Sequence, residues 1–341
     1  MWTAPQHLVG EHVLLRPLTL EDAEQLVGVV DPTFFRHFVG PVCKGTSPQE
    51  VREFVEALLA APNSMAFVVI LRKTGAIIGS SSYLDIREGQ RGIEIGRTWI
   101  VPAHRGTAIN PEMKLLMLRH AFEEFKCVRV QLKCDALNKV SAAAIQKLGA
   151  EPEGILRHHR VRLDGTIGDT AMFGITVLQW RDVERGLIQR LRQLRDHRQS
   201  VEELRSKLMT ALSEALEAIP PHTPVLNDQG GTDAVLGDGV TAESFMEEKP
   251  QPFWTYSEAI ESNGPEVGWI ITLARCVDDC DDYLSSCADF QDSLMAASQF
   301  MGENHVKTPN RARLMMELTS VALSLRGEYT SFLVKEFSKY L

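Results

Sequence analysis

Residues 99–118 read WIVPAHRGTAINPEMKLLML and combine three features in one stretch. An apolar run before Pro102 is typical of a strand, small and polar residues follow, and an apolar helical pattern begins at Pro111. The backbone N–H groups of such a turn, with the positive end of the following helix, form a site for a phosphate or pyrophosphate. The stretch therefore predicts a strand, an anion-binding turn and a helix with Asn110 as its N-cap.

Length and charge indicate more than one structural unit. The chain has 341 residues, which is long for a single domain. Residues 1–200 carry 26 basic against 22 acidic side chains, whereas residues 201–341 carry 10 against 23. We therefore expect two halves of different construction. The net charge of −9 argues against nucleic acid as the main partner.

The sequence carries no sign of membrane insertion or of disulfide chemistry. No apolar stretch approaches the roughly 20 residues that a membrane-spanning helix needs, and no basic N-terminal region precedes an apolar run. These features predict a cytoplasmic protein without a membrane partner. The cysteines form no CxxC pair, which favours reduced thiols. They are Cys43, Cys127, Cys134, Cys276, Cys280 and Cys287.

Apolar periodicity predicts the order β, α, α, β, β, β, α, β, α, β, β over residues 12–177. Ser47 and Glu50 form the pattern of a capping box at the start of the second helix. Five short segments then match a known pattern: Glu94–Arg97, Arg105–Asn110, Asn138–Ser141, Lys147–Ala150 and Glu153–Arg157.

These segments and this order resemble the GNAT superfamily of acyl-CoA-dependent N-acyltransferases, most closely its RimJ/RimL-like branch. The resemblance covers about residues 8–178. It implies an α+β fold, a GNAT-like mixed central sheet of about seven strands flanked by helices. It also implies acetyl-CoA as cosubstrate and an amine as acceptor.

In that superfamily the turn binds the pyrophosphate of the cosubstrate through backbone amides. The residues implied in binding acetyl-CoA are Ile100, Val101, Arg105, Gly106, Thr107, Ala108, Ile109, Asn110 and Asn138. Ala108 stands where the family has Gly, and Asn110 where it has Gly or Ala. A methyl group at position 108 blocks a positive-φ conformation or a close phosphate approach, so Ala108 bears directly on affinity.

Acyl transfer to an amine needs a neutral amine, a polarised carbonyl and a protonated leaving thiolate. We predict Glu94 as general base through a water, because strand alternation places it on one face with Gly96 and Thr98. The same alternation places Ile93, Ile95 and Trp99 on the other face. The alternative is a structural carboxylate that pairs with Arg97 or Arg91.

The resemblance implies further roles for four residues. A backbone N–H around Ile100 or Val101, at the splayed end of the strand, would stabilise the oxyanion. Asn138 and Ser141 would lie beside the pantetheine and thiol, with Ser141 as proton donor; the alternative is an ordinary helix start.

The adjacent His158 and His159 lie on a predicted strand. Only one of two neighbouring strand residues can face the site, and the alternative is a surface pair.

Beyond the acyltransferase domain of residues 1–180, the pattern changes. Residues 181–219 predict one long amphipathic helix that ends at Pro220, and residues 220–252 read as a flexible linker. Residues 253–341 predict an acidic helical hairpin, completed by the helix of residues 181–219 or by a second subunit. Its first helix, Glu266–Met301, would have an apolar seam of Trp269, Leu273, Cys276, Cys280, Leu284, Cys287, Phe290, Leu294 and Met301. The second helix starts at Thr308 and Pro309, with a seam of Met315, Leu318, Ala322, Leu325, Tyr329, Phe332 and Tyr340. We expect a homodimer or a helical partner through residues 181–341.

Residues 278–282 (DDCDD) match the pattern by which isoprenoid synthases hold Mg²⁺. The apolar seam of the helix passes through Cys280, however, and no second such motif follows. We therefore predict no metal site, and we assign Cys276, Cys280 and Cys287 to the core.

Two functions remain open from the sequence. The first is an acetyl-CoA-dependent N-acetyltransferase that acts by direct transfer on a primary amine, either a protein or peptide α-amine or a small molecule. The second is a weak or inactive CoA-binding scaffold whose C-terminal helices mediate protein interaction. Glu94, Arg105, Asn138 and Ser141 favour the first, and Ala108 favours the second.

Overall fold

The computed structural model describes residues 2–220, 222–226, 232–236, 240–248, 267–281 and 309–326. The chain divides into two compact units, Met1–Leu194 and Arg195–Leu341. Each unit has a hydrophobic core of its own.

The first unit is built on an eight-stranded sheet with the order β1-β2-β3-β4-β5-β6-β8-β7. The strands are β1 (Leu8–Val9), β2 (Val13–Pro17), β3 (Met65–Leu71), β4 (Ile77–Arg87), β5 (Gly92–Ile100), β6 (Arg129–Asp135), β7 (Glu151–Val161) and β8 (Ile167–Thr176). Among these described strands, only β5 and β6 pair in parallel. The mixed sheet is thus confirmed, and the eighth strand is the two-residue β1.

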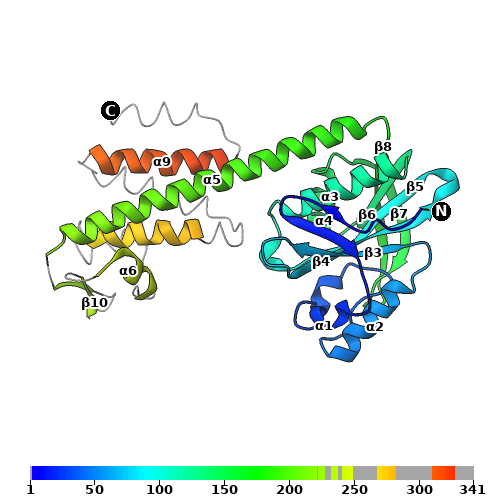
Figure 1. Ribbon diagram of the computed structural model, residues 1–341, viewed down its shortest axis with the longest axis horizontal. Helices are drawn as coiled ribbons and strands as arrows, with labels where there is room; N and C mark the ends of the chain where they lie inside the picture. Colours follow the sequence, from blue (N-terminus) through cyan, green and yellow to red (C-terminus); the bar gives the residue numbers. More distant parts are fainter. Residues whose placement is uncertain are drawn as a thin grey trace. The chain divides into compact units, whose positions relative to one another are not determined.

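Helices cover both faces of this sheet (Figure 1). They are α1 (Asp22–Leu26), α2 (Pro48–Leu59), α3 (Ile109–Arg119), α4 (Lys139–Gln146) and the start of α5 (Trp180–Ala218). Short 3₁₀ turns lie at Pro32–Phe35, Glu88–Gln90 and Pro102–His104, and a π-helical turn at His120–Glu124 extends α3. The core against α1 and α2 includes Trp99, whereas the core against α3 includes Ile93 and Ile95. The predicted order of elements is confirmed.

Local end signals are also confirmed. Ser47 and Glu50 form the predicted reciprocal capping box of α2. Gly149 follows α4 with φ +94°, a conformation that glycine adopts without strain.

A buried carboxylate fixes the first strands to α3. The side chain of Glu112 accepts the backbone N–H groups of Glu11, His12 and Val13 at 2.6, 2.8 and 2.9 Å. It lies so close to Gly10 that a Cβ there would be 2.5 Å from the carboxyl carbon. A tight turn with no side chain at position 10 therefore wraps around this single acceptor.

The second unit begins within α5. Trp180, Val183 and Leu187 belong to the core of the first unit, and residues from Val201 to Ile219 belong to the core of the second. The predicted single long helix before Pro220 is confirmed.

The flexible linker predicted for residues 220–252 was wrong for its described part. Strands β9 (Thr223–Leu226) and β10 (Thr232–Leu236) pair antiparallel, and α6 (Ala242–Glu248) follows. Val225, Leu236 and Phe245 are buried in the core of the second unit. The apolar residues of this Gly- and Asp-rich segment are too widely spaced to show a periodic pattern. They are buried because they pack against the rest of the second unit.

Helical residues 267–281 and α9 (Pro309–Arg326) form the described part of the predicted hairpin. The helix start at Pro309 is confirmed. Trp269, Leu273, Cys276 and Cys280 are buried as predicted, but burial is not confined to one seam, because Val267, Ile270, Ile271, Ala274 and Val277 are buried as well. The predicted seam residues Leu284, Cys287, Phe290, Leu294, Met301, Tyr329, Phe332 and Tyr340 lie outside the described residues.

The acidic run around Cys280 has a structural partner. Asp281 forms an ion pair with Arg205 of α5, with Arg205 Nη2 3.0 Å from Asp281 Oδ2. Burial raises the pKa of the Cys280 thiol to about 12. No cluster of three His, Cys, Asp or Glu side chains suited to a metal occurs within the described part of the chain. Asp282 lies outside it.

The five cysteines that the structure describes are buried. No described helix combines the length and apolar character that crossing a membrane would require.

Replacing Glu112 with Gln tests the anchoring of the first strands. The amide keeps one acceptor oxygen but presents an NH₂ group to backbone donors, so we expect a loss of about 2–4 kcal/mol in local stability. Amide hydrogen exchange of residues 8–17 in the full chain measures it. The control Glu56→Gln, on the exposed face of α2, should leave this exchange unchanged. Equal protection in both variants would contradict the anchoring role.

Candidate active site

Strands β5 and β6 pair for only three residues and then diverge. The pairs are Gly92 with Arg129, Ile93 with Val130 and Glu94 with Gln131. Beyond Glu94, β5 continues to pair with β4, and β6 continues to pair with β8. An opening in the hydrogen-bond ladder therefore begins at the predicted base.

Glu94 is buried at this point, with 2% of the residue exposed. Lys133 Nζ lies 2.9 Å from its Oε2, and Gln131 Nε2 donates to the same oxygen at 3.2 Å. Of the alternative partners, Arg91 donates to the Lys126 carbonyl instead, and Arg97 lies near Glu94 without forming an ion pair among the described residues. Two donors of β6, Lys133 and Gln131, therefore hold the Glu94 carboxylate at the opening.

A β-bulge interrupts β5 after Gly96. Ser82 pairs with Gly96 and Ser80 with Trp99, so Arg97 and Thr98 together oppose Ser81. Arg97 has φ +49°, a left-handed conformation that is typical of a bulge residue.

The extra residue reverses the alternation of the strand, and one prediction was wrong for this reason. Trp99 packs on the face of α1 and α2, opposite Ile93 and Ile95. Thr98 contacts Lys114 of α3 and therefore lies on the face opposite Glu94. Gly96 shares the face of Glu94 as predicted, since a Cβ at position 96 would lie 3.0 Å from Glu94 Oε1.

The two predicted oxyanion donors differ in whether the N–H group is already hydrogen-bonded. The Val101 N–H donates to the Ile78 carbonyl of β4 at 2.9 Å, so the prediction of Val101 as oxyanion donor was wrong. Successive backbone groups of a strand point to opposite edges, so the Ile100 N–H points away from β4, toward the opening. The Ile100 carbonyl supports this direction, because Arg105 Nε donates to it at 2.8 Å.

Lys114 of α3 contacts the β5 bulge from the face of the sheet that α3 covers. Its ammonium donates to Thr98 Oγ1 at 2.5 Å and to Ser81 Oγ at 3.2 Å, and these two hydroxyls are 2.8 Å apart. No acidic side chain pairs with it among the residues that the structure describes. Burial lowers the pKa of Lys114 to about 7.

Helix α3 thus carries two buried charged residues that stabilise backbone and hydroxyl groups rather than bind each other. Glu112 gathers three N–H groups of the β1–β2 turn, and Lys114 holds the hydroxyls of Ser81 and Thr98 under the β5 bulge. The positions differ by two, so on a helix they point in different directions. One helix therefore fixes both an edge of the sheet and the irregular strand that shapes the site.

The turn of residues 105–110 keeps its backbone donors available. No hydrogen bond of the described residues uses the N–H groups of Gly106, Thr107, Ala108 and Asn110. Gly106 has φ +79°. Four amides at the start of a helix fit a pyrophosphate.

The helix start itself differs from the prediction. Helix α3 begins at Ile109, and the N-cap position belongs to Ala108, so Asn110 as N-cap was wrong. The reason is that Thr107 Oγ1 accepts the Ile109 N–H at 3.2 Å, which caps the helix before Asn110. Ala108 has φ −65°, an ordinary conformation for alanine.

The side chain of Arg105 is already engaged within the protein. Besides its bond to the Ile100 carbonyl, the guanidinium lies over the ring of Phe34, with Cζ 5.1 Å from the ring centroid. Arg105 therefore connects the turn to the end of β5 rather than projecting freely.

Asn138 and Ser141 open α4. The Asn138 side chain caps the helix by accepting the Ser141 N–H at 3.0 Å, which is the helix-start role left open as the alternative. The Ser141 side chain hydrogen-bonds the Cys134 thiol; burial raises the pKa of that thiol and the serine opposes the shift. The hydroxyl is thus placed at the end of β6, on the far side of the opening.

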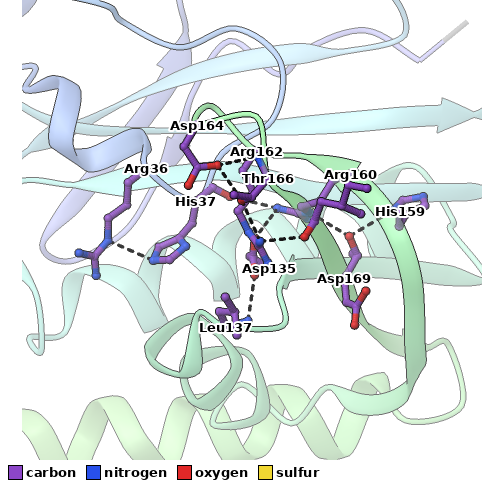
Figure 2. A network of polar contacts seen from close by, with 12 residues as sticks. Arg36, His37, Asp135, Leu137, His159, Arg160, Arg162, Asp164, Thr166 and Asp169 are labelled. Carbon is purple, nitrogen blue, oxygen red and sulfur yellow. Dashed lines mark hydrogen bonds and ion pairs between the residues drawn. The ribbon is translucent and has the colours of Figure 1, made fainter.

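A second buried carboxylate, missed in the sequence, lies on the face of Glu94. Arg162 binds both oxygens of Asp135 at 2.7 and 3.2 Å, and Arg160 approaches it at 4.0 Å (Figure 2). The Arg162 hydrogen bonds lower the pKa of Asp135. Arg160 also donates to the carbonyl of His37 at 3.1 Å.

A bulge in β7 directs these side chains. Residues 157–159 together oppose Asp169, because Leu156 pairs with Thr170 and Arg160 with Gly168. His159 Nδ1 lies 3.0 Å from Thr170 Oγ1, whereas the His158 N–H bonds to Asp169. His159 thus contacts Thr170, but both histidines are exposed, which agrees with the alternative of a surface pair. The spacing of Lys133 and Asp135 on one strand was the signal that could have revealed this face.

Comparison with known proteins gives a consistent result for the first unit. A family model described as the acetyltransferase (GNAT) domain matches residues 12–151. The "Probable N-acetyltransferase YjcK" of Bacillus subtilis (strain 168) is 26% identical over 175 residues, which cover 49% of this chain and 96% of that protein.

The chain is also similar to solved structures of acetyltransferases. The crystal structure of a "putative acetyltransferase" from T. thermophilus is 31% identical with a TM-score of 0.52, covering 56% of this chain and all of that one. Another acetyltransferase structure, also 31% identical, has a TM-score of 0.53 and covers 56% of this chain and 96% of its own. A GCN5-related N-acetyltransferase from Brucella melitensis, 19% identical with a TM-score of 0.50, shares the fold.

Lys114→Met tests the buried ammonium through the pH dependence of stability. The pKa in the folded state, about 7, lies below the unfolded value of 10.5, so between these values the unfolded chain binds more protons. Wild-type stability should therefore rise with pH in this range, by up to about 1.4 kcal/mol per unit. The methionine variant lacks this slope.

Thermal unfolding of both proteins from pH 6 to 9 gives the measurement. We expect Lys114→Met to be the more stable protein at pH 6 and its advantage to shrink as the pH rises. A difference that does not change with pH would contradict a lowered pKa.

Ala108→Gly tests whether the methyl group impairs the turn. Because alanine already adopts the observed φ, we expect the dissociation constant for coenzyme A to change by no more than about threefold. Gly106→Ala is the contrasting variant, since positive φ costs a side chain about 1 kcal/mol or more. Isothermal calorimetry distinguishes the two; a large gain in affinity for Ala108→Gly would restore the blocking role of the methyl.

Proposed function

Because the chain belongs to the GNAT acetyltransferase family, we propose that it transfers an acetyl group from acetyl-CoA directly to an acceptor amine. The observation that carries the proposal is the opening between β5 and β6, which begins at the buried carboxylate of Glu94 and ends beside the Ile100 N–H. A base and an oxyanion donor thereby flank one gap in the sheet.

Backbone N–H groups of this chain can be assigned to binding of the cosubstrate. The free N–H groups of residues 106–108 and of Asn110 would bind the pyrophosphate, and the opening would admit the pantetheine arm. When bound, acetyl-CoA supplies an activated thioester. The side-chain oxygen of Asn138 already accepts the Ser141 N–H as the helix cap. We therefore assign this oxygen no contact with the cosubstrate.

The remaining chemistry rests on four protein groups. Glu94 accepts the amine proton through a water, and Lys133 stabilises the charged carboxylate until it does so. The Ile100 N–H stabilises negative charge on the reacting carbonyl oxygen. The Ser141 hydroxyl donates the proton that the leaving sulfur requires.

The alternative of an inactive CoA-binding scaffold was favoured by Ala108, on the argument that its methyl group would block a positive-φ conformation. Ala108 has an ordinary φ of −65°, so this argument no longer applies. The acceptor class at the coarsest level is an amine, which includes the N-terminus of a protein or peptide as well as small molecules.

Glu94→Gln tests the assignment of the base. The amide cannot accept a proton, so we expect kcat for thiol release from acetyl-CoA with an amine to fall about 10²–10⁴-fold. Affinity for coenzyme A should stay within about threefold, because Glu94 lies away from the turn. Thiol release is followed across a panel of amines, with Glu203→Gln of α5 as control.

Two outcomes would count against the proposal. If wild type releases no thiol with any amine, direct acetyl transfer is refuted. If Glu94→Gln matches wild type, Glu94 is a structural partner of Lys133 and another group is the base.

A further inference from the structure

The face of the sheet that carries Glu94 holds more positive than negative charge. The charged side chains gathered there are Glu94, Arg97, Lys133, Asp135, Arg160 and Arg162. Lys133 pairs with Glu94. Arg160 and Arg162 share Asp135 (Figure 2). Arg97 differs from these three cations because no carboxylate of the described residues lies within ion-pair distance of it.

Arg97 is half-buried and has no acceptor. No carboxylate pairs with it, and no hydrogen bond reaches it, among the residues that the structure describes. Burial lowers its pKa, and the nearby charge of Glu94 opposes that shift only in part. A guanidinium stays charged at any physiological pH, so its partial burial costs free energy unless an anion is supplied.

The backbone aims this side chain at a fixed place. Arg97 is the left-handed residue of the β5 bulge, directly after Gly96. Its guanidinium lies against Gly40, where a Cβ would be 3.3 Å from Nη2. The same segment, residues 37–40, also contacts Arg160 through the His37 carbonyl. Arg97 is therefore held beside Glu94 by two independent constraints.

A second donor without a partner lies on the same face. The Ser82 hydroxyl is buried, with 1% of the residue exposed, and finds no hydrogen-bond partner within the described part of the chain. Ser82 is directly opposite Gly96 across the strand pair, and Gly96 adjoins the Glu94 carboxylate. Buried hydroxyls are normally satisfied, so this one indicates a ligand atom.

We propose that Arg97 binds a carboxylate of the acceptor, with the Ser82 hydroxyl on the same face of the sheet as a second donor, so that the acceptor is an amino-carboxylate compound rather than a simple amine. A guanidinium presents its N–H donors in a planar fork that matches the two oxygens of a carboxylate. The inference rests on the proposed acetyl transfer and adds the acceptor class. Glu94 then meets the amine of a molecule whose carboxylate Arg97 holds.

Matched acceptors test the class with the wild-type protein alone. Each amino acid is compared with its carboxamide, with the amine that lacks the carboxylate, and with the aminophosphonate of the same skeleton. We expect kcat/KM for thiol release to be about 10- to 100-fold higher for the carboxylate, as one charge-assisted hydrogen-bonded pair provides.

Variants of Arg97 then assign the contact. Arg97→Gln should raise KM for the amino acid about 10- to 100-fold and leave KM for acetyl-CoA and for the carboxamide within about threefold. Arg97→Lys keeps the charge and should recover part of the affinity. Arg52→Gln, from an exposed ion pair on α2, is the matched control.

The outcomes separate the two proposals. If no acceptor yields thiol, acetyl transfer itself fails. If amines are acetylated but the carboxylate gives no advantage, or the phosphonate is preferred, the acceptor class is wrong while the transfer stands. If Arg97→Gln changes KM for acetyl-CoA instead, Arg97 belongs to the cosubstrate site.

Discussion

The parallel pairing of β5 with β6 ends after three residue pairs, and the candidate active site depends on that early end. Both strands stay in the sheet because each has a second neighbour, β4 for β5 and β8 for β6. The divergence therefore leaves backbone donors of β5 without a ladder partner inside a well-packed sheet. Such donors are costly in a core and useful in an active site, because they can stabilise charge that develops on a substrate.

The sequence predicts those features that depend on neighbouring residues. The capping box at Ser47, the helix end before Pro220 and the order of elements through residue 177 all rest on local signals, and all are confirmed. Contacts between distant segments leave no such signal. Segment 220–252 shows this, because its few apolar residues are buried only through the rest of the second unit.

The candidate site divides in the same way. Glu94, Ser141 and the turn lie in recognisable segments. The two bulge residues of β5 are neither glycine nor proline, so strict alternation misplaced Thr98 and Trp99. The bulge in β7 likewise gave no sign that Arg160 would reach Asp135 and the His37 carbonyl. An extra residue in one strand is defined only by its partner strand.

Lys114 and Arg97 are desolvated cations on opposite faces of β5, and burial affects their charges differently. Neither has an anionic partner close enough to pair with it among the described residues. An amine can lose its proton, and Lys114 lowers its burial cost that way, with a pKa of about 7. A guanidinium cannot, because its charge is delocalised and its pKa remains far above neutrality. Burial therefore lets Lys114 lose its proton near neutral pH, whereas Arg97 stays a cation. Among the described residues Glu94 lies near Arg97 but forms no ion pair with it, so a carboxylate of the substrate is the partner that we propose.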